Sequence, residues 1–330
     1  MLYYIHSIKL RRICMSIIQI LTPVFTMAAM AAAGFVTSRF IEITAETRRF
    51  ISFTAINFAL PAVVVSSIFQ LGFNRETWIS FAAVYTSSLC FTLFGMLAGY
   101  LAGKGFGYGE MEARQLAIVS GCGNTGFVGI PLIALLFGPE AGSYAAVYDA
   151  GTMTSVFTVG ILLLRPEKFS FRQLKAILNT PFITLLSAVL LAALGVALPV
   201  MLLETADMLS GLAAPLALIL IGLLIPTISK ADWKRVQNGY KRFMAAALVI
   251  KVLLLPAIAC AAVWLLPFPE SLGQIVIVQA SMPTFTLAAV LFERYIIGGA
   301  KQFGIVALIC TTAFSLLMLP VTVWVAQAIS

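Results

Sequence analysis

Ten apolar stretches, each about 20 residues long or longer, follow one another along the chain and leave only short polar connections. They lie at 16–37, 50–71, 77–101, 115–137, 142–164, 178–200, 208–228, 243–266, 272–292 and 302–328. A helix needs roughly 20 apolar residues to cross the hydrocarbon core of a bilayer. Hydrophobic residues make up 61% of the chain and charged residues only 10%, whereas soluble domains average about half and about a quarter. The sequence therefore predicts an all-α polytopic membrane protein with ten transmembrane helices in the lipid bilayer.

The two halves of the chain resemble each other. "TPVFT" at 22–26 opens the first stretch and "TPFIT" at 180–184 opens the sixth, while Pro61 matches Pro215 and Pro131 matches Pro283. The three pairs are offset by 158, 154 and 152 residues, so the order is kept and the spacing changes little. Such matches indicate an internal repeat. Because each half has an odd number of spans, the second half enters the membrane the other way up, and we expect two inverted repeats of five helices at 15–168 and 169–330.

The Lys and Arg residues predict the orientation. Sixteen of the 21 lie in loops after odd-numbered stretches, and four lie on the other side, three of them in the N-terminal extension 1–14. Positively charged loops favour the cytoplasm. The sequence thus predicts a multi-pass protein of the cell membrane with both termini outside the cytoplasm. The extension opposes this orientation, and one explanation is that translation begins at Met15.

The fourth stretch contains residues that interrupt a helix, in "GCGNTGFVGIPLIALLFG" at 121–138. Proline removes a helical hydrogen bond, and glycine adopts conformations that other residues avoid. Irregular backbone survives at this depth only where it packs in protein or lines a wet cavity. A simple proline kink is the alternative. Because "QASMP" at 279–283 occupies the corresponding place in the ninth stretch, we favour two broken helices, the fourth and the ninth.

Two broken helices from inverted repeats would approach the membrane centre from opposite faces. Pro131 and Pro283 are suited to the first position of a new half-helix. The N-terminus of each half-helix carries about half a positive charge and free N–H donors. Asn124 and Thr125 would add polar side chains, and Gln279 could do the same from the other segment. Such a crossing is predicted to bind an anion, particularly a carboxylate, without a fully buried cation.

The strings "GNTGFVGIPL" at 123–132, "VYDAGT" at 147–152 and "QASMP" resemble the auxin efflux carrier family, which includes bacterial carriers and plant auxin exporters. That family is more distantly similar in fold to the bile-acid sodium symporters. The resemblance implies a scaffold of helices 1, 2, 6 and 7 and a transport unit of helices 3–5 and 8–10. It places the substrate site at Asn124, Thr125, Gly126, Gly129, Pro131, Met282 and Pro283. It implies a secondary transporter of small organic anions, such as malonate-like, malate-like or auxin-like acids, that works by alternating access.

Two ionisable residues lie well inside predicted spans, Asp149 and Lys251. Intramembrane charges are rare and are candidates for function. Asp149 is either a proton carrier or a structural hydrogen-bonding residue. Lys251 could have a charge role, but we favour an ammonium that reaches toward the cytoplasm along its own stem. Asn57, near Pro61, is a weak substrate-site candidate that also fits a role in helix packing.

Other functions have less support in the sequence. The chain carries no HExxH or GxSxG motif, its single histidine is His6, and its five cysteines lack metal-ligand spacing. No enzyme, cofactor or metal site is therefore expected. The net charge of +8 comes from membrane-flanking loops, so no nucleic-acid partner is expected. A sodium-coupled symporter, a channel or a non-transporting membrane sensor remain alternatives, the coupling ion could be H⁺ or Na⁺, and a homodimer is one possible assembly.

Overall fold

The computed structural model describes residues 25–26, 28–71, 74–164, 178, 180–224, 226, 241–266, 268–285, 288, 291–292, 296 and 301–329. Regular structure in these residues is helical, apart from one antiparallel bridge between Gly123 and Thr284. The all-α prediction is therefore confirmed for the part of the chain described. The extension 1–14, Met15 and most of the first predicted span lie outside it.

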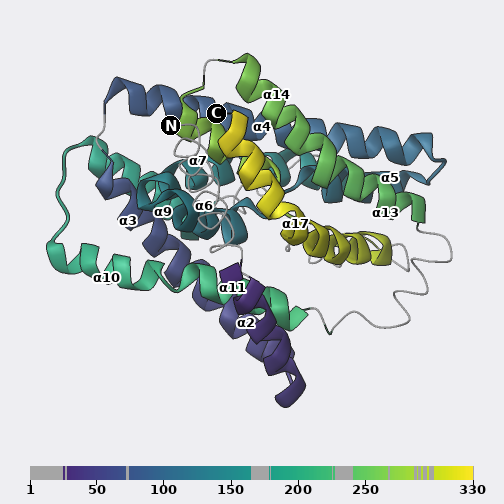
Figure 1. Ribbon diagram of the computed structural model, residues 1–330, viewed down its shortest axis with the longest axis horizontal. Coiled ribbons are helices and arrows are strands. Elements are labelled where there is room, and N and C mark those ends of the chain that lie inside the picture. The colour runs from purple at the N-terminus through teal and green to yellow at the C-terminus, as the bar shows by residue number, and fades with distance from the viewer. Residues whose placement is uncertain are drawn as a thin grey trace, which may run out of the picture.

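Residues 28–40 are helical and precede the labelled elements of Figure 1. The α-helices are α2 (Ala45–Thr54), α3 (Leu60–Gln70), α4 (Arg75–Gly105), α5 (Glu110–Gly121), α6 (Ile130–Phe137), α7 (Pro139–Ser155), α8 (Ile161–Leu164), α9 (Thr180–Ala193), α10 (Val200–Ser210), α11 (Ala213–Leu224), α13 (Lys241–Leu248), α14 (Leu255–Leu265), α15 (Glu270–Ala280) and α17 (Lys301–Ile329). Wider π-helical turns occur at Ala55–Ala59, Thr125–Gly129, Val156–Gly160 and Val249–Leu254.

Several helical stretches are long and apolar enough to cross a membrane. Five single helical stretches meet this requirement: Glu46–Gln70, Arg75–Gly105, Pro139–Leu164, Val200–Leu220 and Lys241–Leu265. A sixth consists of Val306–Ser315 and Leu317–Ile329, bent by 50°. The bend lies four residues before Pro320, as expected where a proline removes the bond to the carbonyl of residue i−4. These helices make the chain polytopic, while the count of ten helices and the inverted relation of the halves stay predictions.

The sixth and seventh spans differ from the predicted boundaries. The helix predicted at 178–200 ends at Ala193, because Gly195 turns the chain with φ 72°. The next helix begins at Val200 rather than at 208, directly after Pro199. A turn at Gly211 then separates α10 from α11. Hydropathy locates such a pair of segments, but it does not detect a glycine turn at their junction.

Three prolines inside spans each follow a π-helical turn. Pro61, Pro131 and Pro256 are the second residues of α3, α6 and α14, and the residue four positions before each proline lies in the preceding π-turn. A proline cannot donate to that carbonyl, and its ring collides with it. Widening the turn moves the carbonyl aside, so the helix continues without a sharp kink.

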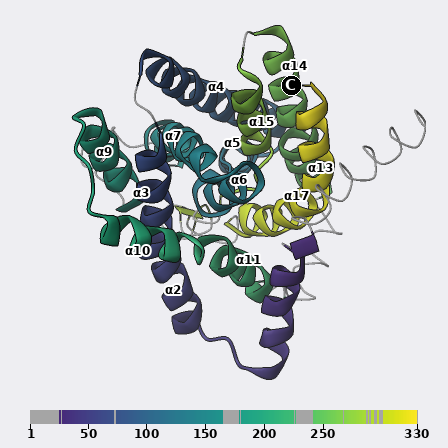
Figure 2. The ribbon, with the colours of Figure 1, turned by 60° about the vertical axis from the view of Figure 1, so that its left-hand side comes forward.

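Figures 1 and 2 both place α6 in the interior of the molecule. The helices α4, α5, α13 and α14 lie on one side of it, and α2, α10 and α11 lie on the other. The helix at 28–40 and α11 meet backbone to backbone at Gly34 and Gly222, where an added Cβ would overlap the facing carbonyl oxygens of Ile219 and Ala31. Small residues permit this close approach between helices in a membrane.

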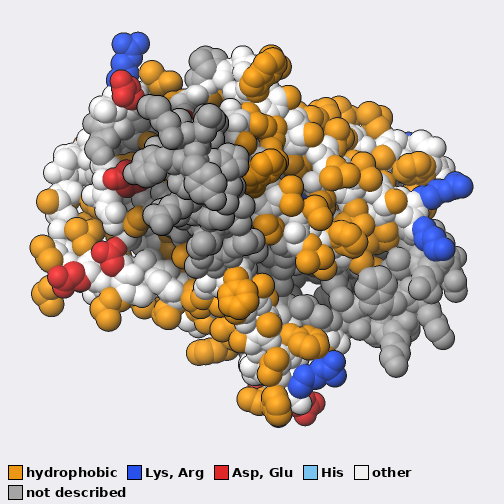
Figure 3. All heavy atoms as spheres, viewed as in Figure 1, with side chains coloured by type: hydrophobic (Ala, Val, Ile, Leu, Met, Phe, Trp, Pro, Cys, Tyr) orange, Lys and Arg blue, Asp and Glu red, His pale blue; other side chains and the backbone are white. Residues whose placement is uncertain are grey.

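The molecular surface is apolar over wide areas. Hydrophobic side chains cover much of the face in Figure 3, and charged groups gather at its edges. Trp264, Leu265 and Leu317 are among the large side chains that are more than two-thirds exposed. A soluble monomer rarely exposes apolar patches of this extent. The distribution fits a surface that contacts lipid.

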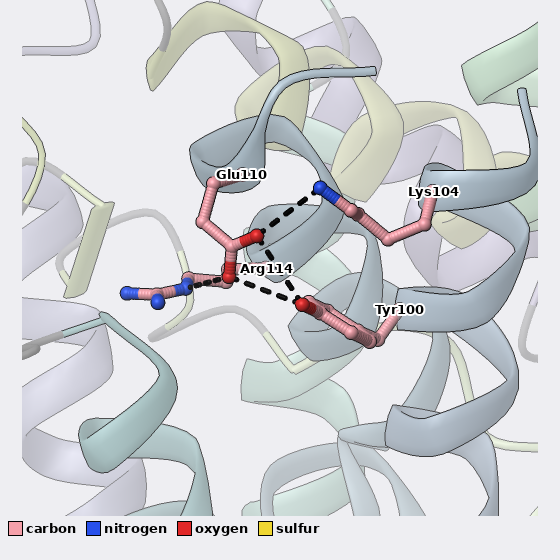
Figure 4. A network of polar contacts seen from close by, with 4 residues as sticks. All are labelled: Tyr100, Lys104, Glu110 and Arg114. Carbon is pink, nitrogen blue, oxygen red and sulfur yellow. Dashed lines mark hydrogen bonds and ion pairs between the residues drawn. The ribbon is translucent and has the colours of Figure 1, made fainter. Parts of the chain in front are cut away.

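A polar cluster joins the end of α4 to the start of α5 (Figure 4). The Glu110 carboxylate accepts hydrogen bonds from Arg114 Nε at 2.8 Å, from Tyr100 OH at 3.1 and 3.2 Å, and from Lys104 Nζ at 3.3 Å. The hydrogen bond from Arg114, followed by those from Lys104 and Tyr100, holds the pKa of Glu110 below its ordinary value. Because Lys104 and Glu110 are exposed, the cluster orients the turn more than it stabilises the fold.

Candidate functional site

Both helices that the sequence predicts to be broken are interrupted in the structure. The helix α5 ends at Gly121 and α15 ends at Ala280, and the chain then runs through short non-helical segments. Asn124 N donates to Pro283 O at 2.7 Å, and Phe285 N donates to Cys122 O at 3.0 Å. These bonds flank the Gly123–Thr284 bridge and pair the segments 122–124 and 282–285, which we call the crossing.

The interrupted backbone at the crossing bonds to other protein groups. The carbonyl of Asn124 accepts from Val128 N at 3.3 Å and from Gly129 N at 3.1 Å. The Thr284 hydroxyl donates to Val119 O at 2.8 Å and accepts from the Thr311 hydroxyl at 2.8 Å. These partners explain how a broken helix can lie in an apolar environment, where an unpaired backbone group costs several kcal/mol.

The two prolines do not begin half-helices as predicted. The helical chain resumes at Thr125 in a π-turn, so Pro131 is preceded by a full turn and is the second residue of α6. The π-turn moves aside the carbonyl to which Pro131 cannot donate. The helix can therefore begin before the proline. Pro283 lies in the extended segment itself, where its carbonyl accepts the bond from Asn124. The free N–H groups of the first half-helix consequently lie at Thr125 and the residues after it.

Asn124 and Thr125 are both buried at the crossing. Within the described residues, the side-chain amide of Asn124 has no hydrogen-bond partner. The Thr125 hydroxyl donates to Asp149 Oδ1 at 2.7 Å. The same carboxylate lies against Gly126, where a Cβ would come within 2.8 Å of both its oxygens. The structure thus brings Asp149 to the crossing.

Gln279 reaches the same turn from α15. Its Nε2 donates to Thr125 O and to Ala145 O, both at 3.3 Å. Its Oε1 faces Gly129 and has no hydrogen-bond partner in the described part of the chain. The two carbonyl acceptors fix the amide orientation, because a reversed amide would place Oε1 against both carbonyls.

Lys251 does not reach toward the cytoplasm, so the favoured sequence interpretation is wrong. Its side chain is only 1% exposed, and its Nζ would lie 3.2 Å from a Cβ at Gly123. The π-turn Val249–Leu254 carries Lys251 into the protein interior beside the crossing. Among the described residues, no ion pair joins Lys251 to Asp149.

The crossing is closely packed. A cavity of about 10 Å³ remains between Lys251, Gly123, Thr125, Tyr148 and Gln279. Met282 is fully buried at the same place, with its Cβ 3.7 Å from a Cβ position at Gly123.

Pro131 and Asn57 lie apart from this small cavity. Pro131 lines a separate cavity of about 440 Å³ between α3, α6, α10 and α11, in which Ser66 donates to Asp207. The Asn57 amide accepts from the Thr180 hydroxyl at 2.6 Å and donates to Phe53 O at 3.0 Å. These bonds favour the packing role for Asn57.

Some residues of the crossing were not selected from the sequence. Gly123 forms the bridge and faces Lys251, while Thr284, directly after Pro283, links the crossing to α5 and α17. Thr284 could have been noted from its place next to "QASMP". Tyr148 and Thr152 line the small cavity with no sequence signal beyond their closeness to Asp149.

Comparison with known proteins finds similarity along most of the chain. A family model described as "Membrane transport protein" matches residues 18–173 and again residues 169–325. A protein of Methanothermobacter thermautotrophicus described as an uncharacterized transporter is 28% identical over 244 residues, which cover 72% of this chain and 76% of the relative. An uncharacterized transporter of Methanocaldococcus jannaschii is 24% identical over 313 residues, covering 92% and 97%.

Proposed function

Because the chain belongs to the family of membrane transport proteins that includes the auxin efflux carriers, we propose that it is a secondary active transporter of small organic anions. The substrate carboxylate binds at the crossing of segments 122–124 and 282–285. The observation that carries this proposal is the side-chain amide of Asn124, which lies at a buried helix break and has no hydrogen-bond partner among the described residues. The family consists of transporters, so the protein is not an enzyme.

The chemistry of the crossing favours an anion. The helical turn that starts at Thr125 presents N–H groups and the positive end of its dipole toward the break. The Asn124 amide supplies two further N–H donors. Gly123 and Gly126 have no side chains, so a ligand can approach the backbone closely. Malonate-like, malate-like and auxin-like acids are the first compounds to test.

Alternating access requires one group of helices to move against another. We propose a scaffold of predicted helices 1, 2, 6 and 7 and a transport unit of helices 3–5 and 8–10. We also propose two repeats near 15–168 and 169–330, and the two family-model matches, over 18–173 and 169–325, divide the chain at nearly the same place. The cavity of about 440 Å³ supports an access route, because it lies between α6 of the transport unit and α3, α10 and α11 of the scaffold. The cell membrane, with both termini outside, is the proposed location.

Replacing Asn124 by alanine should lower kcat/KM for the transported acid about tenfold to a hundredfold. Hydrogen bonds to a charged group contribute about 1.5–3 kcal/mol each. Asn124 has φ −82°, so alanine fits its backbone. The measurement is initial uptake of radiolabelled malonate, malate and indoleacetate into proteoliposomes. Asn74→Ala is the matched control, because Asn74 caps α4 through Thr77 N and its loss should lower the melting temperature while sparing KM. Uptake unchanged in Asn124→Ala would place the site elsewhere.

Asp149 is the proposed proton carrier. Its carboxylate is half-buried and already bonds to Thr125 at the crossing, so its protonation would change the contacts of the first half-helix. Uptake by the native protein should depend on pH, and Asp149→Asn should flatten that profile. The same assay with Na⁺ replaced by choline tests the sodium alternative. Gln279 Oε1, which has no partner in the described part of the chain, favours that alternative, since amide and carboxylate oxygens are ligands for hard cations. A pH profile identical in both proteins would exclude coupling through Asp149.

A further inference from the structure

Lys251 is the only charged side chain that is fully buried in the described part of the chain. It lies in a π-turn between α13 and α14, and Pro256 follows in α14. The side chain is 1% exposed, so its ammonium does not reach water along its stem. It ends beside Gly123, at the bridge between the two broken helices.

No acidic side chain among the described residues forms an ion pair with the Lys251 ammonium. The titratable groups at the crossing are Cys122, Tyr148 and Asp149, and no ion pair within the described residues involves Lys251. The Asp149 carboxylate lies against Gly126 and accepts a hydrogen bond from the Thr125 hydroxyl, not from Lys251. A buried charge without a partner is strongly unfavourable. A negative group beside Nζ would offset this cost, and the described residues do not supply one.

We propose that Lys251 is the counter-charge for the transported anion, and that a substrate carboxylate binds its ammonium beside Gly123. This inference rests on the proposed function and deepens it, because it adds a side-chain cation to the backbone and amide donors of the crossing. Gly123 allows the contact, since a side chain there would fill the space next to Nζ. Phe91, Tyr148 and Leu255 form the apolar walls, which exclude water and strengthen the ion pair.

One consequence concerns coupling. An anion carrier can balance the substrate charge with a bound cation or with a fixed one. Lys251 is fixed to the protein, so carboxylate binding needs no sodium ion for charge balance. The ammonium also neutralises one carboxylate, because the small cavity contains no second cationic side chain among the described residues.

The test compares native protein, Lys251→Met, Lys251→Arg and Lys241→Met in proteoliposomes with radiolabelled malonate, malate and indoleacetate. Lys241 is exposed at the start of the same span and is the matched control. We expect Lys251→Met to raise KM more than tenfold, Lys251→Arg to retain part of the affinity, and Lys241→Met to behave as native. Melting temperatures of the purified proteins provide a second measurement. The transported acid should raise the melting temperature of the native protein, in sodium and in choline buffer alike, and should not raise that of Lys251→Met.

Lys251→Met should fold, because an apolar residue of similar length replaces a buried unpaired charge. A native KM and a native ligand-induced melting shift in Lys251→Met would overturn the counter-charge while leaving the proposed transport function intact. A melting shift that requires sodium would also overturn it. If the native protein neither transports nor is stabilised by any of the three acids, the proposed function fails and this inference fails with it.

Discussion

Gly129→Ala is expected to reduce transport at least about a hundredfold, because a misplacement of about 1 Å in a binding site has effects of this size. A Cβ at this position would overlap Gln279 Oε1 and lie 2.9 Å from Cδ and 3.0 Å from Nε2. The Gln279 amide cannot simply rotate away, since Nε2 holds the carbonyls of Thr125 and Ala145. The methyl group would therefore push apart α15 and the turn that follows the break.

A double-mutant cycle between Gly129→Ala and Gln279→Ala tests this explanation. With the amide removed, the added methyl group has space, so the second substitution should cause little further loss of uptake and of melting temperature. Gly105→Ala is the matched control, because a Cβ there would meet nothing within 4 Å. Additive losses in the cycle would show that Gln279 is not the group that excludes a side chain at position 129.

The largest loss of stability is expected from Gly222→Ala. A Cβ at Gly222 would overlap the carbonyl oxygen of Ala31 and lie 2.8 Å from Phe35 N. Both obstacles are backbone atoms of the helix at 28–40, so the two helices must separate. Overpacking costs about 1–3 kcal/mol and sometimes more, and for a chain of this size that predicts a fall in melting temperature of roughly 5 °C.

Thermal unfolding in detergent measures this effect, with Gly211→Ala as the control from the adjacent turn. A Cβ at Gly211 would be 3.5 Å from Met208 O, an ordinary contact, and its φ of −60° suits alanine. Gly222→Ala should melt clearly below Gly211→Ala. Equal melting temperatures would mean that the helix at 28–40 does not pack on α11 through this glycine.

The crossing could be predicted because its sequence signals are local and strong. The glycines and proline of 121–138, with Asn124, indicate a break by their composition. The matching "QASMP" segment then suggests a partner. Asp149 could be selected for the same kind of reason, as a carboxylate inside an apolar stretch. The bridge of Gly123 with Thr284 confirms that the two segments meet.

Other features depend on geometry that hydropathy does not contain. The π-turns before Pro61, Pro131 and Pro256 shift the phase of each helix, and residue spacing alone cannot foresee that shift. Lys251 is the clearest case. An ideal helix and a flexible side chain suggested that its ammonium reaches the cytoplasmic side, whereas the π-turn places it in the protein interior. The hydrogen bond of Asn57 to Thr180 joins residues 123 positions apart, so it could not be read from either segment.

The bridge at the crossing is made by main-chain atoms, Asn124 N with Pro283 O and Phe285 N with Cys122 O. Truncation of side chains leaves those atoms in place, so scanning mutagenesis with alanine will under-report the contribution of this joint. Among the natural amino acids, only proline deletes an N–H donor. Main-chain hydrogen bonds depend little on which side chains are present, so the joint can persist when the sequence diverges. Relatives that share about a quarter of their residues with this chain can therefore keep it.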